Sequence, residues 1–305
     1  MTKISKTIIF FGNERLATGV TTTTPVIRAL IKQGYPIGAV VSNYATRQSK
    51  NARSLEVAEV AKDNQLPLLL PTRLTDIKKQ LLDLQPEVGV LVAYGKIVPQ
   101  EIIDIFPKGI VNLHPSLLPL HRGPIPIESA ILNGDEKTGM SIMQLAKDMD
   151  AGPVYAQSEL KLTGKESKQI LVDRLLDIGQ AMLLDLLPGI LAGSVVALPQ
   201  DNSRATYDSL LQKNAGIIDW QKPAMQLERE IRAFTEWPKS HTTLKGKEII
   251  IVRAKVIDET GTVGGIKTEN RRLIINCGQQ ALEILELRPA GKQTMTAEAF
   301  IAGNG

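Results

Sequence analysis

The stretch VGVLVAYGKIVPQEIIDIFPKGIVNLH, residues 88–114, begins and ends with short apolar runs of the kind that form buried strands. Similar runs recur outward in both directions, from residue 7 to about residue 162, and they alternate with amphipathic segments. This alternation is typical of β-α-β units around a mainly parallel sheet. We therefore predict an α/β fold whose first domain is a Rossmann-like, mainly parallel sheet.

The domain organisation follows from the same alternation of apolar and amphipathic segments and from one change in amino-acid composition. Other strands are predicted at TIIFFG, IGAVV, LPLLL, MSIMQL and VYAQSEL, and helices at residues 24–33, 54–64, 74–84, 126–133 and 167–187. Near residue 189 the chain becomes rich in small and turn-forming residues. We predict a catalytic domain over residues 1–189, a linker over 190–208 and a C-terminal domain over 209–305. The last contains one helix and four or five short strands, which predict a small β-barrel, with an oligonucleotide-binding (OB) type among the options.

Composition narrows the class of protein. The 305 residues are 43% hydrophobic and 22% charged, as in ordinary globular proteins of about two domains. No uncharged stretch approaches the roughly 20 residues that span a bilayer, and the amino terminus does not resemble a signal peptide. A single cysteine, Cys277, excludes an internal disulfide and a cysteine-rich zinc site. We expect a cytoplasmic monomer with no membrane contact and no metal, and the net charge of +4 permits an anionic partner.

Three polar residues stand where a parallel sheet binds ligands, beyond the carboxyl ends of its strands. Asn112 and His114 end the strand GIVNL, and alternation along a strand points both side chains to one face. Pro115 then ends the strand, and further prolines hold the following loop extended. Asp150 begins the turn DAGPV between two strand-like segments.

An amide, an imidazole and a carboxylate that converge would suit acyl transfer to an amine. The amide and a protonated imidazole donate to a developing oxyanion, and the carboxylate orients the imidazole and helps to remove the amine proton. No serine or cysteine has the context of an activated nucleophile, which favours direct transfer. Taken singly, each residue has an ordinary explanation: a turn amide, a core histidine and a helix cap. The prediction rests on their combination with the proline-rich loop.

These residues carry a family resemblance. NLHPSLLPLHRG followed by DMDAGPV resembles the folate-dependent formyltransferases. The resemblance implies that Asn112, His114 and Asp150 are the catalytic trio and that 10-formyltetrahydrofolate is the cosubstrate. It further implies that the cosubstrate site is lined by Ser116, Leu117, Leu118, Pro119, Tyr94 and Gly95.

The second domain bears on which member of the family this is. ALPQDNSRATYDSLLQKNAGIIDW, QLEREIRAFTEWP and LELRPAGKQTMTAEAF are similar to members that formylate methionyl-tRNA. The resemblance then implies that initiator methionyl-tRNA is the partner. Its acceptor end would meet Arg47, Lys50 and Arg53 of the loop after the second strand, with Arg122 also placed for a phosphate or carboxylate.

The alternatives are other enzymes of this scaffold, which act on a sugar nucleotide or glycinamide ribonucleotide or hydrolyse formyltetrahydrofolate. The glycine-rich phosphate-binding turn of the purine-pathway enzymes is absent after the first strand, where the chain reads FGNERLATG. An RNA-binding protein with a vestigial site is a further alternative, against which the intact trio argues.

Overall fold

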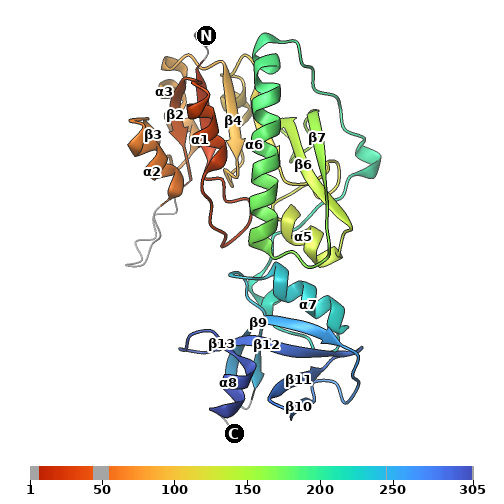
Figure 1. Cartoon of the computed structure of the whole chain (residues 1–305). Coiled ribbons are helices and arrows are strands. Elements are labelled where there is room, and N and C mark those ends of the chain that lie inside the picture. The colour runs from red at the N-terminus through yellow and green to blue at the C-terminus, as the bar shows by residue number, and fades with distance from the viewer. Residues whose placement is uncertain (1–6, 44–54, 245, 304–305) are drawn as a thin grey trace. The chain divides into compact units, whose positions relative to one another are not determined.

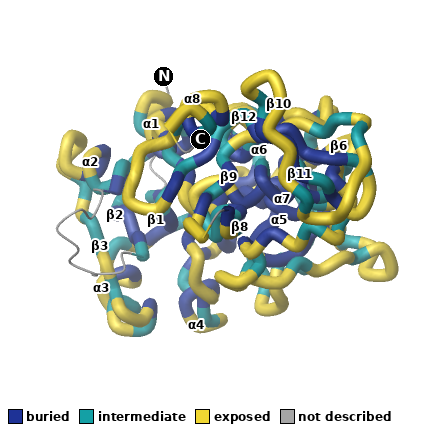
Figure 2. Tube along the Cα trace, turned by 90° about the horizontal axis from the view of Figure 1, so that it is seen from below, coloured by how far each residue is buried: buried dark blue, intermediate teal, exposed yellow. Residues whose placement is uncertain are grey.

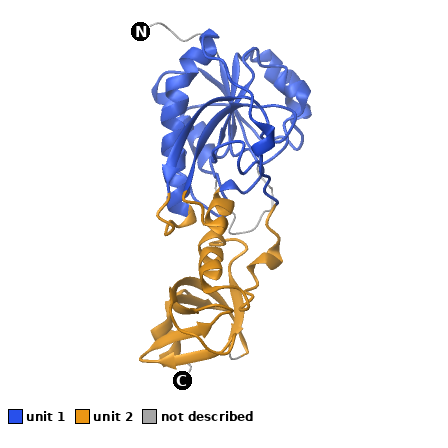
Figure 3. Ribbon diagram, turned by 90° about the vertical axis from the view of Figure 1, so that its right-hand side faces the viewer, with its two compact units in different colours: residues 1–126, 137–161, 169–209 blue, residues 127–136, 162–168, 210–305 orange. Residues whose placement is uncertain are grey.

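The computed structural model describes residues 7–43, 55–244 and 246–303 and divides the chain into two compact units (Figure 3). Unit 1 comprises residues 1–126, 137–161 and 169–209, and unit 2 comprises residues 127–136, 162–168 and 210–305. The predicted division into catalytic domain, linker and C-terminal domain stays a prediction. Unit 1 contains the whole segment predicted as a linker, residues 190–208.

Unit 1 is built on a seven-stranded sheet in the order β3-β2-β1-β4-β5-β6-β7. The pairs from β3 to β5 are parallel, whereas β5, β6 and β7 pair antiparallel. The central strands are buried along their whole length, which accounts for their continuous apolar runs (Figure 2). The strands are β1 (Ile8–Gly12), β2 (Ile37–Val41), β3 (Leu68–Leu69), β4 (Val88–Val92), β5 (Ile110–His114), β6 (Lys137–Gln144) and β7 (Val154–Lys161).

Helices α1 and α6 lie over one face of this sheet (Figure 1). Gly179 of α6 permits close packing, because a Cβ there would stand only 3.1 Å from Leu113 of β5 and Met140 of β6. The helices up to residue 204 are α1 (Pro25–Lys32), α2 (Glu56–Asp63), η1 (Leu74–Ile77), α3 (Lys78–Asp83), α4 (Gln100–Ile103), α5 (Pro126–Asn133), α6 (Lys168–Ala192) and η2 (Asn202–Arg204).

The predicted end of the long helix at residue 187 is wrong. Helix α6 continues through Pro188 to Ala192, and Gly193 ends it in a left-handed conformation with φ of 75°. A proline inside a helix removes one backbone hydrogen bond. Burial of Ile190 and Leu191, which are 3% and 5% exposed, offsets that loss.

Helix α6 is also the one helix of the described chain long and apolar enough to cross a membrane by length and composition. Leu171, Val172, Leu175 and Leu183 of this helix are fully buried, whereas Ile170 is 53% exposed. Fully buried apolar residues are typical of a helix that packs on the core of a globular unit.

Unit 2 contains one antiparallel sheet that forms a half-barrel, with strand pairing in the order β10-β11-β12-β9-β8 and β13 beside β12. The prediction of a Rossmann-like sheet followed by a small β-domain is confirmed. Helix α7 packs on this sheet, and the buried core includes Cys277. The elements are η3 (Lys213–Gly216), α7 (Ala224–Ala233), β8 (His241–Leu244), β9 (Lys247–Ile257), β10 (Ile266–Glu269), β11 (Arg272–Asn276), β12 (Ala281–Pro289), β13 (Met295–Thr296) and α8 (Ala297–Ala302).

Candidate active site

Asn112 and His114 both belong to β5, at the carboxyl end of the parallel part of the sheet. Asn112 lies beside Leu91 of β4, and His114 lies beside Ser141 of β6. The two side chains are two residues apart on one strand and therefore share a face. Both residues are buried, with 6% and 5% of their surface exposed. Buried polar groups need hydrogen-bond partners, and the partners of the His114 ring define its chemistry.

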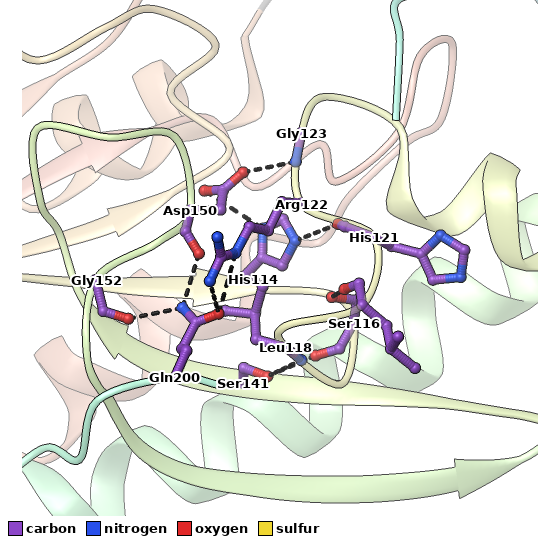
Figure 4. A network of polar contacts seen from close by, with 11 residues as sticks. His114, Ser116, Leu118, His121, Arg122, Gly123, Ser141, Asp150, Gly152 and Gln200 are labelled. Carbon is purple, nitrogen blue, oxygen red and sulfur yellow. Dashed lines mark hydrogen bonds and ion pairs between the residues drawn. The ribbon is translucent and has the colours of Figure 1, made fainter. Parts of the chain in front are cut away.

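The hydrogen bond of the His114 ring fixes its tautomer. Its Nε2 lies 2.9 Å from the carbonyl oxygen of His121, and a carbonyl can only accept, so Nε2 must carry a proton. The other ring atom, Nδ1, faces the Asp150 carboxylate with 3.7 Å to Oδ1 (Figure 4). This separation is too long for a direct hydrogen bond but suits an ion pair once His114 is protonated. Proton exchange by His114 is therefore directed to Nδ1.

Asp150 is held from several directions. Its Oδ2 accepts a hydrogen bond of 2.9 Å from the backbone N–H of Gly123. The residue adopts a left-handed conformation, with φ of 49°, in the turn before Gly152. A Cβ at Gly152 would stand 1.9 Å from the carbonyl oxygen of Gln144, so only glycine fits there. The turn therefore brings a carboxylate from the β6–β7 connection to the end of β5.

The predicted cosubstrate wall, residues 116–119, is anchored by side chains. Ser116 Oγ donates to the carbonyl of Leu120 at 2.6 Å, and Ser141 Oγ donates to the carbonyl of Ser116, also at 2.6 Å. The N–H of Leu118 donates to Ser141 Oγ at 3.1 Å, and Gln157 donates to the Leu118 carbonyl at 2.8 Å. The Leu118–Pro119 peptide bond is cis. Strands β6 and β7 thus hold the loop in one shape.

Tyr94 and Gly95 follow β4 at the same edge of the sheet. The Tyr94 ring is only 2% exposed and lies edge-on to Phe11, with 5.9 Å between ring centroids. Burial raises the pKa of the Tyr94 hydroxyl to about 12. That hydroxyl has no hydrogen-bond partner in the described part of the chain. Tyr94 therefore remains neutral and packs as a core residue, while Gly95 turns the chain with φ of 75°.

Arg122 is not placed for the phosphate or carboxylate contact that the sequence suggested. The residue is only 1% exposed, and among described residues its guanidinium donates to uncharged groups. Nε and Nη2 both reach Gln200 Oε1, at 3.1 and 2.8 Å. Nη2 also reaches Asn202 and Nη1 reaches the Tyr207 hydroxyl, at 2.7 and 2.8 Å. A cation buried in this way is not available to a nucleic acid.

The other predicted tRNA contacts, Arg47, Lys50 and Arg53, lie outside the described residues. In unit 2, two cations of β9 are ion-paired. Arg253 pairs with Glu286 at 2.8 Å, and Lys255 pairs with Glu283 at 3.3 Å. Pairing with a carboxylate reduces the positive charge that these two residues present to a nucleic acid.

The sequence did not predict the contribution of residues 200–208. This segment lies beside the loop that follows β5, and Arg122 and Tyr207 form an isolated parallel bridge. The Arg122 N–H donates to the Thr206 carbonyl at 2.9 Å, and the Asp208 N–H donates to the Arg122 carbonyl at 2.8 Å. Because the segment reads as turn-rich and polar, no local pattern distinguishes it from an ordinary connection.

No group of three or more histidine, cysteine, aspartate or glutamate side chains in the described ranges could hold a metal ion.

Two family models match the chain. Residues 15–187 match Formyl transferase, and residues 210–305 match Formyl transferase, C-terminal domain. The methionyl-tRNA formyltransferase of Chloroflexus aurantiacus is 37% identical over 306 residues, which cover 97% of this chain and 96% of the relative. That of Methylococcus capsulatus is 37% identical over 301 residues, which cover 96% of each chain.

Solved structures share the fold at low sequence identity. An N-formyltransferase from Helicobacter canadensis, in complex with folinic acid and dTDP-3-aminofucose, has a TM-score of 0.69 at 16% identity, covering 95% of this chain and 99% of that chain. The methionyl-tRNA formyltransferase from Clostridium thermocellum has a TM-score of 0.54 at 17% identity, covering 83% and 94%. A HypX variant from Aquifex aeolicus has a TM-score of 0.69 at 15% identity, covering 98% of this chain and 48% of that longer chain.

Proposed function

The chain belongs to the formyl transferase family, and from that premise we propose that Asn112, His114 and Asp150 carry out its chemistry. Its activity is the transfer of the formyl group of 10-formyltetrahydrofolate to the α-amino group of methionyl-initiator tRNA, as in the relatives that match it along nearly their whole length. The observation that carries the proposal for the site is the pairing of His114 Nδ1 with Asp150 beside the Asn112 amide.

Each residue has a distinct task in this scheme. The methionyl amine attacks the formyl carbon, and negative charge develops on the formyl oxygen. The Asn112 side-chain amide donates to that oxygen, from a buried position where a hydrogen bond is stronger than in water. The attacking amine must lose a proton, which the Asp150 carboxylate or His114 Nδ1 can accept. The bond between the formyl carbon and N10 of the cosubstrate then breaks, N10 takes up a proton, and tetrahydrofolate leaves.

The cosubstrate is expected along residues 116–119. Residues 118–121 form a turn and not the extended loop that the prolines predicted. Hydrogen bonds from Ser141 and Gln157 hold this loop in one shape, which suits a flat ring system. We assign Arg47, Lys50 and Arg53 to the phosphates of the tRNA acceptor end. The fit of the loop to folate depends on its fixed shape, whereas the tRNA contact depends on charge.

We further propose that the protein acts as a cytoplasmic monomer without membrane contact. Burial of Leu171, Val172, Leu175 and Leu183 of α6 supports the absence of membrane contact. Light scattering coupled to size-exclusion chromatography measures the mass directly, and a dimeric mass would exclude the monomer.

Asn112→Ala tests the central assignment. We expect formylmethionyl-tRNA to form about a hundredfold or more slowly, since loss of one oxyanion donor costs roughly 3 kcal/mol of barrier. Folate binding, followed by fluorescence quenching, should persist. A folded variant with near-normal formylation would exclude this role for Asn112. Parallel reactions without tRNA detect formate release, which would favour the hydrolase alternative.

A further inference from the structure

The side-chain amide of Gln200 is saturated with hydrogen bonds on both of its sides. Its Nε2 donates to the carbonyl oxygens of Asp150 and Gly152, at 2.8 and 2.7 Å. Its Oε1 accepts from Nε and Nη2 of Arg122, at 3.1 and 2.8 Å. All four hydrogen-bonding positions of the amide are therefore used. Figure 4 shows Gln200 between Arg122 and the turn that carries Asp150.

The orientation of this amide is set by its partners. A guanidinium can only donate and a backbone carbonyl can only accept, so Oε1 must face Arg122 and Nε2 must face the turn. A flipped amide would lose all four hydrogen bonds. Arg122 thus fixes which end of Gln200 meets Asp150, and the positive charge of Arg122 polarises the amide so that its N–H groups donate more strongly.

Arg122 is itself held in place by backbone pairing. Its N–H and carbonyl bond to Thr206 and Asp208, and Asn202 and Tyr207 take its remaining guanidinium contacts. The segment that contains Gln200 is therefore fixed to the loop after β5 at several points. Gly123 in that loop donates to the Asp150 carboxylate. Both the carbonyl and the carboxylate of Asp150 are held through this one assembly.

Such support stabilises the turn, because Asp150 adopts a left-handed conformation, which is uncommon for a residue other than glycine. A small rotation of the turn would change the 3.7 Å separation between the carboxylate and His114 Nδ1. Catalysis depends steeply on such separations.

We propose that Gln200, oriented by Arg122, is a positioning residue of formyl transfer: it holds the main chain of Asp150 so that the carboxylate stays opposite His114. The proposal rests on the catalytic roles proposed above for His114 and Asp150. Gln200 does not contact the reacting atoms in this scheme. Its effect on the rate is transmitted through Asp150.

The experiment is a double-mutant cycle between Gln200 and Asp150 in the full-length protein. Gln200→Glu keeps the length of the side chain and its contact with Arg122 but cannot donate to the two carbonyls. Gln200→Leu removes both sides of the bridge. Each is made alone and with Asp150→Asn, and Ser203→Ala is the matched control. Ser203 lies in the same segment and is exposed, and its hydroxyl donates to Asp201 within the segment, at 2.6 Å.

We expect Gln200→Glu and Gln200→Leu to lower kcat about tenfold to a hundredfold, with KM for 10-formyltetrahydrofolate within about twofold of wild type. Asp150→Asn should lower kcat by about a hundredfold or more. Because Gln200 acts through Asp150, the double variants should be no slower than Asp150→Asn. The pH profile of kcat should shift in both Gln200 variants, which a change in stability alone would not cause. Ser203→Ala should match wild type.

Circular dichroism identifies which variants are folded, and if Gln200→Leu does not fold, Gln200→Glu decides. Wild-type kcat and pH profile in a folded Gln200 variant would overturn the proposal. So would double variants whose losses equal the product of the single losses. If Asp150→Asn keeps normal activity, the assumed role of Asp150 fails, and this result is distinct from a failure of Gln200 alone.

Discussion

Glu14 gives the wild-type protein a pH dependence of stability that can be worked out from the structure. This carboxylate follows β1, is 0% exposed, and accepts hydrogen bonds from the N–H groups of Val26 and Ile27 in the first turn of α1, at 2.9 and 2.8 Å. Burial raises its pKa from 4.5 to about 7, although the two backbone hydrogen bonds and Arg28 act in the opposite direction. The folded state therefore favours the protonated form.

The sign and size of the effect follow from linkage. Because the folded pKa lies above the unfolded one, the stabilisation is fully present below pH 4.5 and is lost as the pH rises through about 7. A pKa rise from 4.5 to about 7 corresponds to roughly 3 kcal/mol in total. Between pH 5 and pH 8, about 2.5 kcal/mol of that free energy of unfolding should be lost.

Glu14→Gln isolates this contribution, since glutamine resembles protonated glutamate in shape and cannot ionise. The free energy of unfolding of both proteins is measured by urea denaturation at pH 5, 6, 7 and 8, and hydrogen exchange of α1 gives a local readout. We expect wild type to lose about 2.5 kcal/mol relative to Glu14→Gln between pH 5 and pH 8. Curves that change in parallel over this range would refute the assignment to Glu14.

Two further predictions concern the cations assigned from the sequence. Replacement of Arg47, Lys50 and Arg53 by glutamine should weaken tRNA binding and flatten its salt dependence by a slope of up to about 3, while folate binding is unchanged. An unaltered slope would remove these residues from the tRNA site. Arg122→Met should instead lower the free energy of unfolding by about 2–4 kcal/mol, because it removes the hydrogen bonds of a buried guanidinium to Gln200, Asn202 and Tyr207. Its tRNA binding should keep the wild-type salt slope, and a flattened slope would restore Arg122 as a phosphate contact.

The strands of unit 1 were predictable because their signal is local. A strand that is buried on both faces requires an apolar residue at nearly every position, as in β1 and β4. The end of α6 was not predictable in this way. Pro188 is a local signal to stop, whereas burial of Ile190 and Leu191 depends on the rest of the fold.

The candidate active site likewise has one part that the sequence predicts and one part that depends on the tertiary structure. Spacing by two residues on one strand is enough to place Asn112 and His114 on one face, so the sequence alone determined that half of the constellation. Only the tertiary structure decided that the Asp150 turn reaches His114 and that Gln200, fifty residues further along the chain, holds that turn. It also placed Arg122 inside the unit rather than at its surface. The physical reason is that side-chain alternation is a property of a few neighbouring residues, whereas hydrogen bonds between distant segments form only after the sheet has brought them together.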